Sequence, residues 1–120
     1  MKVMLLGALL LASGWAAAAD RDGKHAVLGP VSCGRFIEDR KEGRWQAMPH
    51  AAWVEGYITA YNRHVPDTYN LLGGIDVERV IQRLENWCSV NVDKPLVEGL
   101  EKLIVELNPR RQRAAKDAVN

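Results

Sequence analysis

Residues 77–88, VERVIQRLENWC, carry the clearest structural pattern in this sequence of 120 residues. The apolar side chains recur three or four positions apart, which places them on one face of an α-helix. They are Val77, Val80, Ile81, Leu84, Trp87 and Cys88. Asp76 stands directly before the stretch and is a favoured N-cap residue. The stretch therefore predicts an amphipathic helix whose buried face ends in a cysteine.

A second apolar stripe follows toward the C-terminus. We expect Asp93 to cap a helix that has Pro95 in its first turn and stops near Asn108 and Pro109. Its inward side chains at helical spacing are Leu96, Leu100, Leu103, Ile104 and Leu107. Because each buried Leu or Ile contributes about 1.5–3 kcal/mol of transfer free energy, these two stripes are predicted to supply most of the core.

A longer helix is predicted before this pair. Pro49 suits its first turn, because the fixed φ of proline fits that position, and the helix is expected to run to about Arg63. Gly56 weakens such a helix, and we expect a close approach by another helix as compensation. One helical face carries Trp53, Tyr57, Ala60, Tyr61 and His64.

A short helix is expected over residues 33–40, with Ser32 as its N-cap and Gly43 at its end. The connection 62–74 contains proline and glycines and is predicted to point Leu71 and Leu72 inward. No stretch alternates as a strand would. The predicted fold class is all-α, a small bundle of about four helices.

The N-terminus has the pattern of a secretory signal peptide. Lys2 is followed by an apolar run to about Trp15 and by four alanines, and cleavage is predicted after Ala19. Removing 19 of the 120 residues leaves 101, enough for one small domain. We expect a flexible leader at 20–31, the helical domain at 32–108 and a basic, frayed tail at 109–120. The predicted location is the periplasm.

The chain has two cysteines, Cys33 and Cys88. In an oxidising compartment such a pair is expected to form a disulfide. Redox or metal chemistry is disfavoured, because neither cysteine belongs to a C-x-x-C motif or another dense ligand cluster. The bond closes a loop of about 56 residues, which in the chain-entropy model stabilises the fold by about 4 kcal/mol.

Charge and motifs exclude several kinds of function. The whole chain has a net charge of +1, and loss of Lys2 makes the mature chain neutral, which argues against a nucleic-acid binder. No cysteine stands at the cleavage point to carry a lipid anchor, so no stable membrane anchor is expected. The basic residues of the tail are expected to be solvated, with a phosphate or membrane contact as the alternative; they are Arg110, Arg111, Arg113 and Lys116.

We expect no enzyme, metal or cofactor. The three histidines, His25, His50 and His64, are dispersed, and the last two are 14 residues apart, about 21 Å along one helix, too far to share a metal ion. His64 is expected to lie on the surface or near a helix C-terminus. Neither G-x-S-x-G, H-E-x-x-H nor a P-loop occurs. An enzyme would have to use a polar pocket around Glu55, Arg63 and His64.

Two surfaces are candidates for binding a partner. Trp45 stands in a polar connection without a periodic partner, so it is expected either to cover one end of the core or to anchor a partner. The second surface brackets Pro66, where a hydrogen-bonded turn is the alternative interpretation. It comprises Tyr61, Asn62, Arg63, His64 and Tyr69. Trp53 and Trp87 are expected to be core residues.

Several of these residues together resemble the Rap1a/Tai immunity family of small exported helical proteins. The matching residues span 33 to about 107 and are Cys33-Gly34-Arg35-Phe36, Trp53-Val54-Glu55-Gly56-Tyr57-Ile58, Asn62, Asp76, and Trp87-Cys88 with Asn91. The family's Asn-Pro after the second cysteine is Asn91-Val92 here. The resemblance implies a protein that binds and neutralises a peptidoglycan amidase toxin delivered by type VI secretion.

The chain also resembles the HdeA-type acid chaperones, which are small periplasmic helical proteins with one disulfide and a Trp-x-x-Gly-Tyr-like helix. That resemblance implies opening at low pH to hold unfolding client proteins. The leading hypothesis is an immunity-type protein that occludes an amidase, and the alternatives are an acid chaperone or a helical protein with another binding partner. The partner is thus expected to be a protein, a toxin or a client, and the sequence leaves open whether the chain forms a homodimer.

Overall fold

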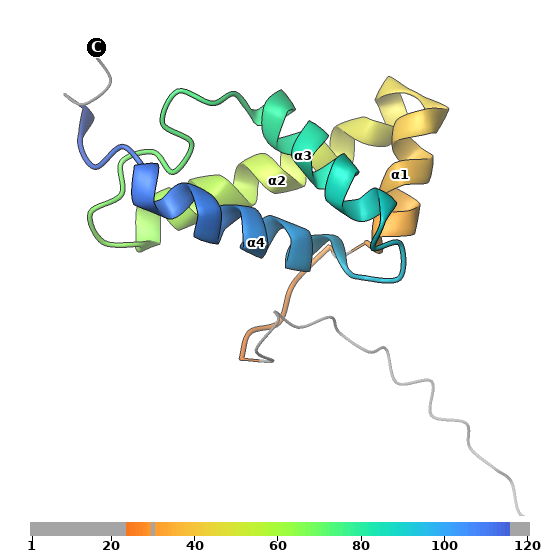
Figure 1. Cartoon of the computed structure of the whole chain (residues 1–120), viewed down its shortest axis with the longest axis horizontal. Helices are drawn as coiled ribbons and strands as arrows, with labels where there is room; N and C mark the ends of the chain where they lie inside the picture. Colours follow the sequence, from red (N-terminus) through yellow and green to blue (C-terminus); the bar gives the residue numbers. More distant parts are fainter. Residues whose placement is uncertain (1–23, 30, 116–120) are drawn as a thin grey trace, which may run out of the picture.

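The computed structural model describes residues 24–29 and 31–115. Within them the chain forms four α-helices and a short 3₁₀ turn, without a strand: α1 (Cys33–Glu42), α2 (Arg44–His64), α3 (Val77–Ser89), α4 (Leu96–Leu107) and η1 (Asn108–Arg110). α2 and α4 run along the length of the bundle, α1 lies at one end, and the connection after α2 lies at the other (Figure 1). The all-α prediction is confirmed.

A disulfide joins α1 to α3. Cys33 begins α1, Cys88 lies in the last turn of α3, and their Cα atoms are 4.8 Å apart with both side chains fully buried. Two of the three predicted N-caps, Ser32 and Asp76, are also present. The Ser32 hydroxyl accepts from the N–H of Arg35 at 3.2 Å, and the Asp76 carboxylate accepts from the N–H of Arg79 at 2.8 Å.

α2 begins earlier than the sequence predicts. The prediction that Pro49 lies in its first turn is wrong, because the helix already starts at Arg44. Gly43, with a φ of 135°, ends α1 and leads directly into α2, which leaves Pro49 inside the helix. Proline has no N–H to donate to the carbonyl of Trp45, and a proline in a helix interior costs about 3 kcal/mol. Contacts of α2 with α1, described below, offset this cost.

The buried face of α2 is also shifted by one position from the predicted stripe. His50, Val54 and Ile58 are buried, whereas Trp53, Tyr57 and Tyr61 are half-buried at the edge of the core. Of the other two residues of the predicted stripe, Ala60 and His64 are exposed. The aromatic side chains gave the stronger sequence pattern, but the smaller residues beside them fit the space between the helices.

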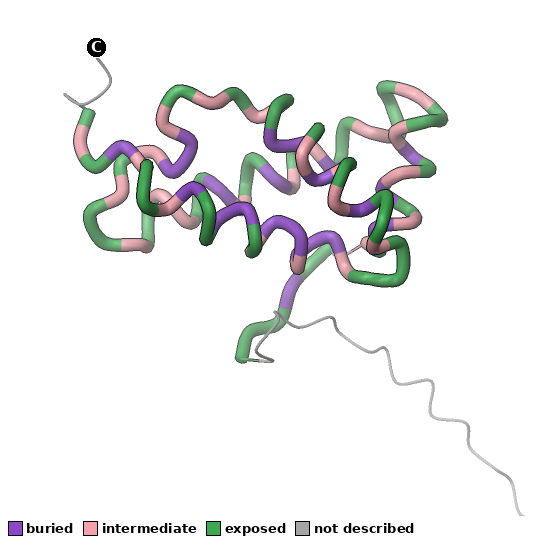
Figure 2. Tube along the Cα trace, viewed as in Figure 1, coloured by how far each residue is buried: buried purple, intermediate pink, exposed green. Residues whose placement is uncertain are grey.

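The core lies between α2, α3 and α4 and is closed at one end by α1 (Figure 2). The apolar stripes predicted for α3 and α4 are confirmed, since Val80, Ile81, Leu84 and all five inward residues of α4 are buried. Leu71 and Leu72 of the connection after α2 are buried as predicted. Trp87 is half-buried and packs against this core.

The close helix approach expected at Gly56 occurs at Gly99 instead. Gly56 is exposed, and a methyl group built there meets no atom within 4 Å. At Gly99 of α4 the same methyl group would lie 2.5 Å from Cε3 of Trp87. Gly99 therefore lets the indole ring of α3 pack against the backbone of α4.

The start of α4 is one of the differences from the sequence prediction. Asp93 is exposed and does not cap the helix; Pro95 is the N-cap, and no side chain caps the first turn. The preceding loop is held by α1, because the N–H of Cys33 donates to the carbonyl of Lys94 at 2.8 Å. The N–H of Leu96 donates to the carbonyl of Val31 at 2.9 Å. Backbone pairing thus replaces the expected side-chain cap.

The tail predicted to fray from residue 109 is docked at its start. Gln112 is buried and pairs with Asn70 through its backbone, and Arg111 donates to the carbonyl of Asp67 and the hydroxyl of Thr68. These contacts tie the tail to the connection after α2. Residues 116–120 lie outside the described residues.

The leader also makes contacts. Val27 is buried, and the indole N–H of Trp53 donates to the carbonyl of Leu28 at 2.8 Å. The predicted signal peptide lies outside the described residues. None of the helices in 24–29 and 31–115 has the length and apolar character needed to cross a membrane.

Candidate functional site

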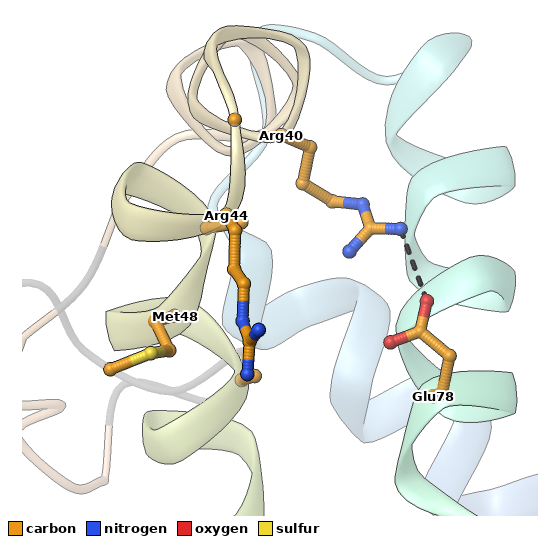
Figure 3. A pocket seen from close by; sticks show the side chains of 7 residues that line it. Arg40, Arg44, Met48 and Glu78 are labelled. Carbon is orange, nitrogen blue, oxygen red and sulfur yellow. Dashed lines mark hydrogen bonds and ion pairs between the residues drawn. The ribbon is translucent and has the colours of Figure 1, made fainter.

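A cleft of about 330 Å³ opens where α1, α2 and α3 meet. We call it the three-helix cleft (Figure 3). It is lined by Arg40 and Gly43 at the end of α1, by Arg44, Ala47, Met48 and Ala51 of α2, and by Glu78 of α3. The cleft is open on its α2 side because two of the four α2 residues that line it are alanines, whose side chains are small.

Arg40 forms one wall of the three-helix cleft and is held by two carboxylates. Its Nε donates to Glu85 at 3.0 Å. Its Nη2 donates to Glu78 at 3.3 Å, the bond drawn in Figure 3. The Arg40 side chain is only 21% exposed. These bonds link α1 to α3 across the cleft, so the position of the Arg40 guanidinium is fixed before any ligand arrives.

Arg44 is the second cation of the three-helix cleft. Its side chain extends along α2 between Met48 and Arg40 (Figure 3). Among the residues that the structure describes, Arg44 makes no ion pair. It is exposed, so its guanidinium donors remain available to an acceptor from outside the chain.

Trp45 follows Arg44 of this cleft in the sequence and is 78% exposed. It occupies the first turn of α2, so the expected covering role over the core is wrong: a helix that starts at Arg44 turns this side chain outward. Met48 lies one turn further on, is 50% exposed and also lines the cleft. Trp45 and Met48 are three positions apart on α2, the spacing at which side chains of one helix are neighbours.

A buried pair of ionisable residues connects α1 to the same part of α2. Nε2 of His50 lies 2.6 Å from Oδ2 of Asp39, and both side chains are buried. Nη2 of Arg35 lies 2.7 Å from Oδ1 of Asp39. The His50 ring also meets the Phe36 ring edge to face, with centroids 5.6 Å apart. These contacts tie the turn of α2 that contains Pro49 and His50 to α1.

The surroundings of Asp39 favour its charged form. The hydrogen bond with His50 lowers the pKa of Asp39, burial opposes that effect, and Arg35 lowers the pKa further. No predicted site residue belongs to this pair. The available signal was spacing, since Asp39 follows Cys33 and Phe36 at intervals of six and three residues and so lies on the buried face of α1.

The second predicted surface is split by the structure into fixed and exposed residues. The hydroxyl of Tyr61 donates to the side chain of Asn108 at 2.9 Å, and the Asn62 side chain accepts from the N–H of Leu71 at 2.8 Å. Tyr61 therefore ties α2 to the end of α4, and Asn62 holds the connection after α2 in place. Arg63 and His64 are exposed, and Tyr69 is 53% exposed.

The two predicted surfaces lie at opposite ends of α2. Trp45 and Tyr61 are separated by 16 residues of one helix, which is about 24 Å. The two predicted surfaces therefore do not form one contact site. The three-helix cleft and Trp45 form one surface, and Arg63, His64 and Tyr69 lie near another.

The residues of the enzyme alternative are all on the surface of α2. Glu55, Arg63 and His64 are exposed, and about 12 Å of helix separates Glu55 from Arg63. His25 is exposed in the leader, whereas His50 is buried against Asp39. In residues 24–29 and 31–115 no group of three or more His, Cys, Asp or Glu side chains is arranged to hold a metal ion.

A further hollow of about 310 Å³ lies between the leader, α2 and α4. The Trp53 and Tyr57 rings, with centroids 5.4 Å apart, form one side and Glu101 contributes to the other. Residues 25–28 of the leader line it as well. Because the Leu28 carbonyl is bound by Trp53, the leader itself occupies part of this aromatic surface.

Comparison with known proteins adds no relative. No protein-family model, no curated protein and no solved structure matches the chain.

Proposed function

We propose that this protein is an exported, immunity-type binding protein that neutralises a cell-wall-degrading amidase toxin by blocking its active-site cleft. It acts as a stoichiometric partner without chemistry of its own. Two considerations support the proposal: the resemblance of residues 33 to about 107 to the Rap1a/Tai family, and the exposed Trp45 side chain on a rigid helix.

The observation that carries the proposal is the exposure of Trp45, three positions before Met48, which lines the cleft together with two arginines. Trp45 is 78% exposed, so its apolar indole ring lies in water. This exposure does not stabilise the monomer. Tryptophan and arginine are the residue types that most often carry the binding energy of protein interfaces. Their position on a helix, fixed to α1 through His50 and Asp39, means that little conformational entropy is lost on binding.

The test is inhibition of an amidase by the purified mature chain. Amidases retained from a periplasmic extract, and toxin amidases supplied by type VI secretion, are titrated with the protein at micromolar concentration. We expect inhibition to reach its end point at a fixed molar ratio, and Trp45→Ala to weaken it by about tenfold or more.

Val105→Ala is the matched control, because Val105 is also an exposed apolar residue, on α4. It should leave inhibition unchanged. If no amidase is inhibited, or if the Trp45 and Val105 variants inhibit equally well, the proposal is wrong.

A second candidate function is that of an acid-activated periplasmic chaperone, and the Asp39–His50 pair favours it. Asp39 is buried, charged and hydrogen-bonded between α1 and α2, so protonation in acid removes an interaction that holds the two helices together. Binding of an apolar dye and suppression of client aggregation near pH 2 to 3 would support it. A protein that stays closed at that pH is not such a chaperone.

A further inference from the structure

We propose that the three-helix cleft binds a carboxylate of the partner protein, carried by an acidic residue that is flanked by apolar ones. This inference rests on the proposed function, because it names the chemistry of the partner's contact. The cleft would then provide the specificity of the interface, and Trp45 would provide its apolar anchor.

The four charged groups at the cleft, two arginines and two glutamates, carry no net charge, but their hydrogen bonds are unevenly shared. Arg40 already donates to both Glu78 and Glu85, so these three groups supply their own hydrogen bonds. Arg44 lines the same cleft and has no ion pair among the described residues. An incoming carboxylate would meet the Arg44 guanidinium, whose planar set of donors matches two carboxylate oxygens.

The remaining lining is apolar and small. Ala47, Met48 and Ala51 form the α2 side of the cleft, and the volume of about 330 Å³ leaves room for a side chain between α2 and α3. If the incoming carboxylate had only polar neighbours, the apolar lining of the cleft would remain exposed to water. An acidic residue next to a leucine or similar side chain fills it, and continues over Met48 toward Trp45.

The walls of the cleft are fixed in advance by contacts already described. Arg40 ties α1 to α3, and the hydrogen bond of His50 with Asp39 ties α1 to α2. The disulfide between Cys33 and Cys88 also joins α1 to α3. Binding therefore does not have to order the three helices, which raises the affinity obtained from a small contact.

Glu78 gives the inference a second prediction with the opposite sign. Its carboxylate lines the cleft, is 63% exposed and lies near the position expected for the incoming acid. The Glu78 carboxylate would repel an incoming carboxylate close to it. Glu78 also competes with it for the Arg40 donors. Removing the Glu78 charge should therefore strengthen binding of a carboxylate, whereas removing the Arg44 charge should weaken it.

The experiment uses a defined probe and the mature protein labelled with ¹⁵N. The probe is the peptide acetyl-Ala-Leu-Glu-Leu-Ala-amide, and its matched controls carry Gln or Lys in place of Glu. Amide shifts are followed during titration, and we expect saturable changes at Gly43, Ala47 and Ala51 with the Glu peptide. Free glutarate is titrated separately to distinguish a site for a peptide from one for any small carboxylate.

Three variants decide the outcome. Arg44→Gln should weaken binding of the Glu peptide by about fivefold, and Glu78→Gln should strengthen it by about twofold to fivefold. Arg63→Gln, which removes an exposed arginine at the other end of α2, should have no effect. Equal binding of the Glu and Gln peptides, shifts located elsewhere, or equal effects of the Arg44 and Arg63 variants would overturn the inference, as would glutarate binding as well as the peptide.

The inference and the proposed function fail in different ways. If Arg44→Gln inhibits an amidase as well as the unaltered protein does while Trp45→Ala does not, the carboxylate site is wrong and the binding function stands. If the peptide binds as described and no amidase is inhibited, the site stands with a partner of another kind.

Discussion

Two glycines in helices give predictions of opposite sign, and both follow from the packing around them. Gly56 in α2 is exposed, and a methyl group there meets no atom within 4 Å. Gly99 in α4 is buried, and the same methyl group would lie 2.5, 2.9 and 3.1 Å from three atoms of the Trp87 ring. A sequence-based helix propensity would treat the two positions alike.

The expected magnitudes can be worked from these distances. Replacing an exposed helical glycine with alanine removes a propensity cost of about 1 kcal/mol, so Gly56→Ala should stabilise the protein by about 0.5–1 kcal/mol. Gly99→Ala gains the same propensity but must displace the Trp87 ring. Overpacking of this kind costs about 1–3 kcal/mol, so the variant should be less stable than the unaltered protein.

The assay is urea denaturation followed by circular dichroism, with the free energy of unfolding extrapolated to water. Near-ultraviolet circular dichroism reports the Trp87 environment, and Gly99→Ala should change that signal while Gly56→Ala should not. A Gly99→Ala protein as stable as Gly56→Ala would show that α3 and α4 do not pack as described. Destabilisation by Gly56→Ala would show that the outer face of α2 is covered.

Three other changes test the fold. Reducing the bond between Cys33 and Cys88, which are 55 positions apart, should cost about 4 kcal/mol and lower Tm by roughly 15–30 °C; an unchanged Tm after complete reduction, checked by thiol titration, would contradict this. Because the pKa of Asp39 is lowered in the folded state, its contribution is present above the ordinary aspartate pKa and is lost as pH falls below about 4. Asp39→Asn should therefore flatten the acid side of the stability profile, and a profile identical to that of the unaltered protein would refute the role given to the pair with His50. Asp76→Ala should cost about 1 kcal/mol by removing the α3 cap, measured by urea denaturation against the exposed control Asp93→Ala, and equal losses in both would argue against the cap.

The sequence predicted those parts of the fold that depend on local pattern. The stripes of α3 and α4 and the caps at Ser32 and Asp76 were correct because periodicity and capping are properties of neighbouring residues. The start of α2 was wrong because α2 begins directly after Gly43, and the Asp39–His50 hydrogen bond ties the turn that contains Pro49 to α1. Proline position alone carries no information about that contact.

The candidate site was predicted only in part. Trp45 stood out as an unpaired aromatic residue, but its exposure followed from the early start of α2. Arg40, Arg44 and Glu78 were not selected, because a cleft between three helices depends on how the helices meet. Tyr61 and Asn62 were selected for recognition, yet they hydrogen-bond to groups 47 and 9 residues away, which no local pattern reveals.

We propose that the protein binds its partner through the first half of α2. Hydrogen–deuterium exchange of the protein without residues 1–19, alone and in complex with an inhibited amidase, tests this proposal. We predict that complex formation protects residues 43–51 and the start of α3, with little change at 62–74. Protection confined to 62–74, with 43–51 exchanging as in the free protein, would contradict the claim.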